Sequence, residues 1–90
     1  MMNKENKNEM LEEMVIDALD VQGNSTPVAV SKYIWDVFGS QLKASGDILY
    51  TWQYDIRWAV QRLSKAGKVV IDTTCRPTIW SLTYKNAEVY

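Results

Sequence analysis

The residues best suited to chemistry are polar and aromatic side chains that recur at helical spacing over residues 51–66. On a helical wheel with Ile56 at the centre of the apolar sector, the other side carries Tyr54, Trp58, Gln61 and Lys65, flanked by Arg57 and Arg62. Guanidinium, amide and hydroxyl groups are the usual donors to nucleic-acid phosphates and base edges. Large aromatics in the same place also suit a protein interface. Both uses stay open at this point.

The charge distribution favours a basic working half on an acidic support. Net charge is −1. Residues 1–49 hold four lysines against eight acids, whereas residues 50–83 hold five basic residues against two acids. A division of this kind is typical of chains in which one half contacts an anionic partner.

The composition argues against catalysis. The chain has no histidine and one cysteine, Cys75, which excludes an internal disulfide and argues against a zinc site. It has no glycine-rich phosphate loop and no carboxylate pair in an apolar stretch. We therefore expect no enzyme activity, no cofactor, no metal and no small-molecule substrate. Cys75 is interpreted as a bystander thiol.

The sequence also gives no sign of a membrane or export segment. No apolar run approaches the roughly 20 residues that a membrane span needs, and no signal-peptide pattern is present. A cytoplasmic protein is expected, with no membrane partner.

The first half of the chain predicts two helices around a short strand. Residues 1–8 are polar and expected to be flexible. A helix over 9–22 follows, and glycine and polar residues end it at 23–25. Residues 26–30 predict a short edge strand, and residues 30–38 a second helix that Gly39 stops. Its inward residues are expected to be Val30, Ile34, Val37 and Phe38. Residues 41–49 are expected to form a loop.

The second half predicts a long helix and a hairpin. Thr51 suits the N-cap of a helix over 51–66, and Gly67 suits the left-handed position after it. Ile56, Val60 and Leu63 should be fully buried. Residues 68–73 and 78–83 are β-branched and alternating, which predicts two strands joined by a turn. Residues 84–90 form a tail, so the domain is expected to span residues 9–83.

The order helix, strand, helix, helix, strand, turn, strand is that of a winged helix-turn-helix, an α+β fold of three helices and a small antiparallel sheet with a β-hairpin wing. The runs Ile56-Arg57-Trp58-Ala59, Lys65-Ala66-Gly67 and Ile79-Trp80-Ser81-Leu82-Thr83 resemble the N-terminal domain of Mrr-type restriction proteins. In that family an arginine often precedes the position of Ile56, where this chain has Asp55 nearby and Arg57 after it. No metal-nuclease core of the Asp…Glu-x-Lys type is present. The resemblance implies a DNA-binding fold and does not imply cleavage.

On this fold the third helix enters a major groove and the wing contacts the backbone. The expected groove contacts are Thr51, Gln53, Tyr54, Arg57 and Gln61. The expected backbone contacts are Lys68, Thr74 and Arg76. The alternative for the charged residues is an ordinary solvated helix face.

The tryptophans bear on the choice of partner. Trp58 is expected to pack within the chain, for example against residues 41–49, rather than to meet a partner. One of Tyr33 and Trp35 must lie near the surface, and Trp80 is expected at the edge of the core. The sequence thus predicts a small double-stranded-DNA-binding protein, a transcriptional regulator or accessory factor of bacterial, phage or mobile-element origin, with helix 51–66 in the groove and wing 73–78 on the backbone. The alternative is a protein–protein interaction module that uses outward aromatics, and homodimerisation is left open.

Overall fold

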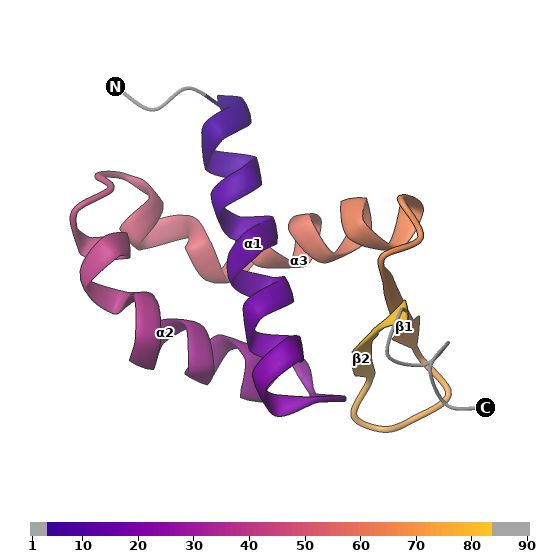
Figure 1. The fold of residues 1–90 in the computed structure, drawn as a ribbon. Coiled ribbons are helices and arrows are strands. Elements are labelled where there is room, and N and C mark those ends of the chain that lie inside the picture. The colour runs from indigo at the N-terminus through magenta and orange to yellow at the C-terminus, as the bar shows by residue number, and fades with distance from the viewer. Residues whose placement is uncertain (1–3, 84–90) are drawn as a thin grey trace.

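The computed structural model describes residues 4–83, which form three helices and a two-stranded antiparallel sheet. The elements in chain order are α1 (Lys4–Gln22), α2 (Pro27–Lys43), α3 (Ile48–Lys65), β1 (Val69–Asp72) and β2 (Ile79–Leu82). The helices pack on one another, and the hairpin lies beside the C-terminal half of α3 (Figure 1). This is the layout of a winged helix-turn-helix, so the predicted α+β fold is confirmed. The predicted tail at 84–90 lies outside the described residues.

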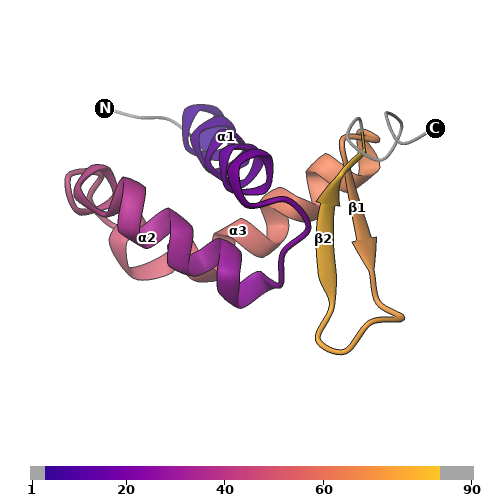
Figure 2. The same cartoon turned by 60° about the horizontal axis from the view of Figure 1, so that its bottom comes forward.

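The core lies where α1 crosses α3 and where α2 and the hairpin close the sides (Figure 2). Its fully buried members include Leu11, Leu19, Ile34, Leu42, Ile56 and Val60. Leu63 is also buried, so the inward face predicted for the long helix is confirmed. Burial of this apolar face is the main stabilising term for a chain of this size. None of the helices described within residues 4–83 is long and apolar enough to cross a membrane.

The first helix begins at Lys4 rather than near Glu9. Its added turns are tied to α3, because the Lys7 Nζ atom lies 3.0 Å from the Asp55 carboxylate. A second ion pair joins the Arg62 Nε atom to the Glu12 carboxylate at 2.6 Å. Contacts between distant segments of the chain therefore order part of a stretch that its polar composition suggested was flexible.

The second helix is longer than predicted, and the predicted strand over 26–30 is wrong. Thr26 is the N-cap of α2, with its hydroxyl accepting a hydrogen bond from the Ala29 N–H at 3.1 Å, and Pro27 occupies the first turn. The only strand-like pairing in this segment of the described structure is at Ser25, whose N–H and C=O exchange hydrogen bonds of 2.9 and 2.8 Å with Trp80.

Gly39 does not stop α2, which runs on to Lys43. Gly39 is buried against the Trp35 ring, and a Cβ atom there would lie 3.6 Å from that ring. Packing therefore outweighs the low helix propensity of glycine. Val30 and Ile34 are buried as predicted, whereas Val37 is 54% exposed and Phe38 only half-buried, so the inward placement of Val37 is wrong.

The third helix begins at Ile48, so the predicted loop over 41–49 shrinks to residues 44–47. Burial of Ile48 in the core accounts for the early start. Thr51 is therefore inside the helix and is not its N-cap; its hydroxyl donates to the Asp55 carboxylate at 2.7 Å. At the other end Gly67 adopts a positive φ of 78°, which confirms its predicted position after the helix.

The hairpin matches the prediction to within a residue at each end. β1 and β2 pair antiparallel in a register that sets Val69 opposite Leu82 and Asp72 opposite Ile79. Trp80 is only 5% exposed and belongs to the core rather than to its edge. Because Trp80 also pairs with Ser25, the hairpin is fixed to the start of α2.

Candidate nucleic-acid interface

A concave face lies between the start of α2, the outward side of α3 and the wing. It is hollowed in three adjoining places, which together we call the concave face. α2 contributes Pro27, Val28 and Ser31, α3 contributes Tyr50, Gln53, Tyr54, Arg57, Trp58 and Gln61, and the wing contributes Thr73 and Thr78. α1 packs against the other side of α3 (Figures 1 and 2), so this side is left uncovered by the described helices.

The fold fixes the three sides of this face independently of its exposed side chains. The Ser25–Trp80 bridge joins the start of α2 to β2, and Trp80 itself lines two of the three hollows. The turn after α3 is closed by hydrogen bonds from the Lys68 N–H to the Leu63 carbonyl (2.9 Å) and from the Gly67 N–H to the Ser64 carbonyl (3.0 Å). The face is therefore preorganised by backbone pairing, which reduces the cost of binding a partner.

Arg57 lies at the centre of the concave face. It lines all three hollows and its side chain is exposed. Within the part of the chain that the structure describes, it forms no ion pair and no side-chain hydrogen bond. Its guanidinium fork is therefore available for a carboxylate, a phosphate or a guanine edge.

Aromatic rings flank Arg57. The Tyr54 and Trp58 rings meet edge to face, with centroids 6.1 Å apart and an interplanar angle of 69°. Tyr50 is 84%, Tyr54 63% and Trp58 53% exposed. The expectation that Trp58 packs inside the chain is therefore wrong, since its ring contact is with Tyr54 at the surface. Of Tyr33 and Trp35, Trp35 is the more exposed. Its ring stacks on Trp52 with centroids 6.0 Å apart.

The predicted groove residues are mostly brought together. Gln53, Tyr54, Arg57 and Gln61 all line the concave face. Thr51 does not, because it lies off this face and its hydroxyl is bonded to Asp55.

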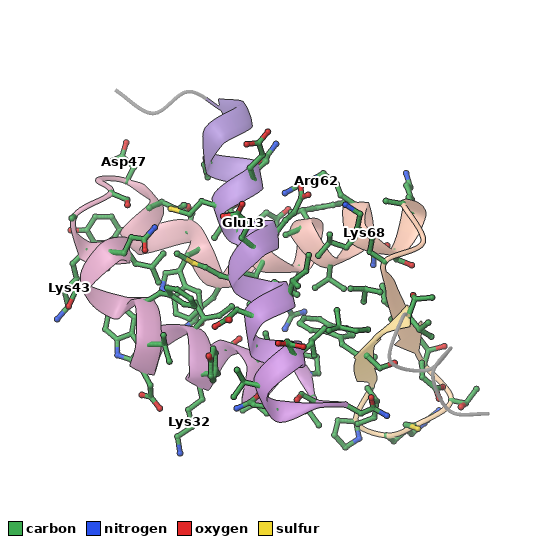
Figure 3. The ribbon with its side chains drawn as sticks, in the orientation of Figure 1. Glu13, Lys32, Lys43, Asp47, Arg62 and Lys68 are labelled. Atoms are coloured by element: carbon green, nitrogen blue, oxygen red, sulfur yellow. The ribbon has the colours of Figure 1, made fainter. Side chains whose placement is uncertain are left out.

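The predicted wing contacts are more scattered. Arg76 is exposed in the wing turn but does not line the concave face. Thr74 donates its hydroxyl and its N–H to the Asp72 carboxylate, at 2.5 and 2.9 Å. Lys68 lies at the opposite end of the hairpin from the wing turn, where α3 ends (Figure 3). Lys68 is therefore not a wing residue, contrary to its predicted grouping with Thr74 and Arg76.

The wing also carries a negative charge. Hydrogen bonds from the Thr74 hydroxyl, from the Thr74 N–H and from Cys75 hold the pKa of the Asp72 carboxyl below its usual range. Asp72 is therefore ionised at neutral pH, and it weakens the attraction of this end of the wing for phosphate. Cys75 is exposed, and its thiol lies 3.6 Å from the Asp72 carboxylate.

Sequence reasoning missed the contributions of α2 and of the wing's inner residues. Pro27, Val28 and Ser31 reach the concave face because α2 begins two residues after Ser25, which pairs with β2. The signal was present in the dipeptide Thr26-Pro27, which is the N-cap and first-position pattern of a helix start. Thr73 and Thr78 could be found only once the direction of the hairpin was known.

The described residues hold no group of three histidine, cysteine, aspartate or glutamate side chains that could bind a metal ion. Comparison of the chain with models of protein families, with curated proteins and with solved structures found no match. The resemblance to the N-terminal domain of Mrr-type proteins therefore stays an interpretation of short motifs.

Proposed function

We propose that the chain binds double-stranded DNA, with α3 in the major groove and the wing beside the backbone, as a cytoplasmic transcriptional regulator or accessory factor. The observation that carries the proposal is Arg57, unpaired among the described residues, at the centre of a concave face bounded by a helix start and a wing. Winged helices bind DNA with a helix and a hairpin in this relative placement.

The surroundings of Arg57 support the proposal. Gln53, Gln61 and Tyr54 offer further donors and acceptors on the same side of α3. The first turn of α2 adds the positive end of a helix dipole to the rim. Among the acids of α1 whose side chains the structure describes, none lines this face; Glu12 is paired with Arg62, and Asp17 accepts from the Tyr33 hydroxyl at 2.6 Å.

A second candidate function, protein–protein interaction that includes homodimerisation, is favoured by one observation. Tyr50, Tyr54 and Trp58 are more than half exposed along α3. Tryptophan and tyrosine are among the residues that most often dominate protein interfaces, whereas exposed ion pairs contribute little. Under this alternative the three aromatics would supply most of the affinity, and the charge of Arg57 would add little.

A DNA titration at two salt concentrations separates these functions. With tens of micromolar protein, binding to duplex DNA should register at about 50 mM salt and weaken steeply by about 200 mM, because phosphate contacts release counterions. Arg57→Ala should reduce the affinity. Lys43→Ala is the matched control, because Lys43 is a cation at the end of the molecule farthest from the wing (Figure 3). It should leave the affinity unchanged.

The outcome that would reject DNA binding is the absence of any signal at low salt. Light scattering in the same buffer then measures the oligomeric state. A dimer that Tyr54→Ala with Trp58→Ala dissociates, and that Arg57→Ala leaves intact, would establish the protein interface instead.

A further inference from the structure

One of the three hollows of the concave face is small, largely apolar and formed by α3 alone. Its lining is Tyr54, Arg57, Trp58 and Gln61, which stand on adjacent turns of one helix side. The two rings meet at 69°, so they form the walls of an open corner rather than a flat stack. The hollow therefore combines an apolar corner with the guanidinium of Arg57 and the amide of Gln61.

The major groove offers one apolar group to such a corner, the C5 methyl group of thymine. It also offers the O6 and N7 atoms of guanine, which an arginine fork can contact at once. Phosphate contact alone would use Arg57 but would leave the corner formed by Tyr54 and Trp58 unfilled. Base contact uses all of these side chains together.

We propose that this hollow holds the methyl group of a thymine while Arg57 contacts a neighbouring guanine. The inference rests on the proposed DNA-binding function and adds a sequence preference to it. Trp58 and Tyr54 provide the apolar contact, and the guanidinium of Arg57 provides the hydrogen bonds. The preferred site in DNA therefore contains a thymine next to a guanine.

Binding-site selection from random duplexes followed by single-base replacement tests the proposal. The wild-type chain should enrich a thymine next to a guanine. Replacing that thymine by deoxyuridine removes only the methyl group, and should weaken binding about fourfold, the value for burying one such carbon. Replacing other thymines of the selected duplex in the same way should have no effect.

Variants of the lining residues test whether the difference between the thymine and deoxyuridine duplexes arises at this hollow. In Trp58→Ala, the thymine and deoxyuridine duplexes should bind equally, whereas Trp58→Phe should restore part of the difference. Tyr50→Ala is the matched control, because Tyr50 is an exposed aromatic of α3 that does not line this hollow; it should keep the difference. Arg57→Lys keeps the charge and loses the planar fork, so the guanine preference should weaken.

The results that would contradict this inference differ from those that would contradict the proposed DNA-binding function. DNA binding by the wild-type chain with no thymine preference, or with no effect of deoxyuridine, would overturn this inference and leave the proposed function standing. Absence of DNA binding would overturn both. A wild-type dimer that Trp58→Ala converts to monomer, with equal binding of both duplexes by the wild type, would assign the hollow to a second copy of the chain.

Discussion

α3 has two sides that use the same residue type in opposite ways. On the side facing α1, Arg62 is half-buried and its Nε atom is paired with Glu12 at 2.6 Å. On the concave face, Arg57 is exposed and unpaired among the described residues. Both arginines lie on the flanks of the same apolar sector. What separates them is the position of α1, which covers one flank and leaves the other open (Figure 3 shows Arg62 beside α1).

Counting charges along the sequence therefore does not locate a binding surface. Arg62 and Lys7 contribute to the positive count of the chain, yet each is paired with a carboxylate of the neighbouring helix. Their charges therefore add little to the field on the concave face. Arg57, by contrast, forms no ion pair and no side-chain hydrogen bond with the described residues, so Arg57 and Arg62 should show different phenotypes when they are replaced.

The largest effect should come from the core that separates the two sides. Leu63 is buried between them. Leu63→Ala should lower the free energy of unfolding by about 2–5 kcal/mol through lost apolar burial and a cavity. Urea unfolding followed by circular dichroism measures this. A loss below about 0.5 kcal/mol, the range of surface substitutions, would mean that Leu63 is not in the core.

The next effect should be that of Arg57 on DNA affinity. Arg57→Ala should cost about 1–3 kcal/mol of binding free energy if the arginine contacts a base. The free energy of unfolding should change by less than about 0.5 kcal/mol, because the side chain is exposed and unpaired. Fluorescence anisotropy on a labelled duplex and urea unfolding give the two numbers. A large loss of stability with unchanged affinity would reverse the roles of the two arginines.

Arg62 should show the converse behaviour. Arg62→Ala should lower the free energy of unfolding by about 0.2–1 kcal/mol, the range for a partly exposed ion pair, and should leave DNA affinity close to that of the wild type. The buried Arg62 Nη2 atom has no hydrogen-bond partner among the described residues, which keeps the expected value small. Glu12→Gln tests the same pair from the other helix. A loss of affinity with Arg62→Ala that Glu12→Gln does not reproduce would place Arg62 in the interface.

These expectations mark what the sequence could and could not provide. The amphipathic pattern of α3, the turn at Gly67 and the alternating strands are local signals, and each was predicted. Gly39 was misjudged as a stop because α2 continues beyond it to bury Leu42 in the core, a tertiary contact that no local pattern shows. For the same reason, the sequence predicted only part of the candidate site. The helical wheel put both Arg57 and Arg62 at the flanks of α3, and only the packing of α1 shows which of them is available.

The wing also holds one exposed side chain and one that is bonded within the chain, and smaller effects are expected there. Arg76 is exposed in the turn, and Thr74 is already bonded to Asp72. Arg76→Ala should weaken binding equally on unrelated duplexes and reduce the slope of log K against log salt by about one unit. Titrations at several salt concentrations give the slope. An unchanged slope would remove Arg76 from the backbone contacts.

Thr74 should affect the titration of Asp72 more than the binding of DNA. Its hydroxyl is the largest cause of the lowered pKa of the Asp72 carboxyl, followed by its N–H. Because the pKa in the folded chain is depressed, the stabilisation by these hydrogen bonds is present above the ordinary pKa of about 3.9. It is lost as the pH falls through that value toward the folded pKa.

Thr74→Val removes the hydroxyl donor, so the Asp72 pKa measured by NMR should move up toward its ordinary value. Asp72 stays ionised at neutral pH in both proteins, so DNA affinity there should hardly change. Ser81, on β2 opposite β1 and away from the wing turn, offers the control Ser81→Ala, which should not move this pKa. If Thr74→Val left the Asp72 pKa in place while weakening DNA binding, the Thr74 hydroxyl would be a phosphate donor. Thr74 would then differ from Arg62, whose side chain is occupied by a contact within the chain.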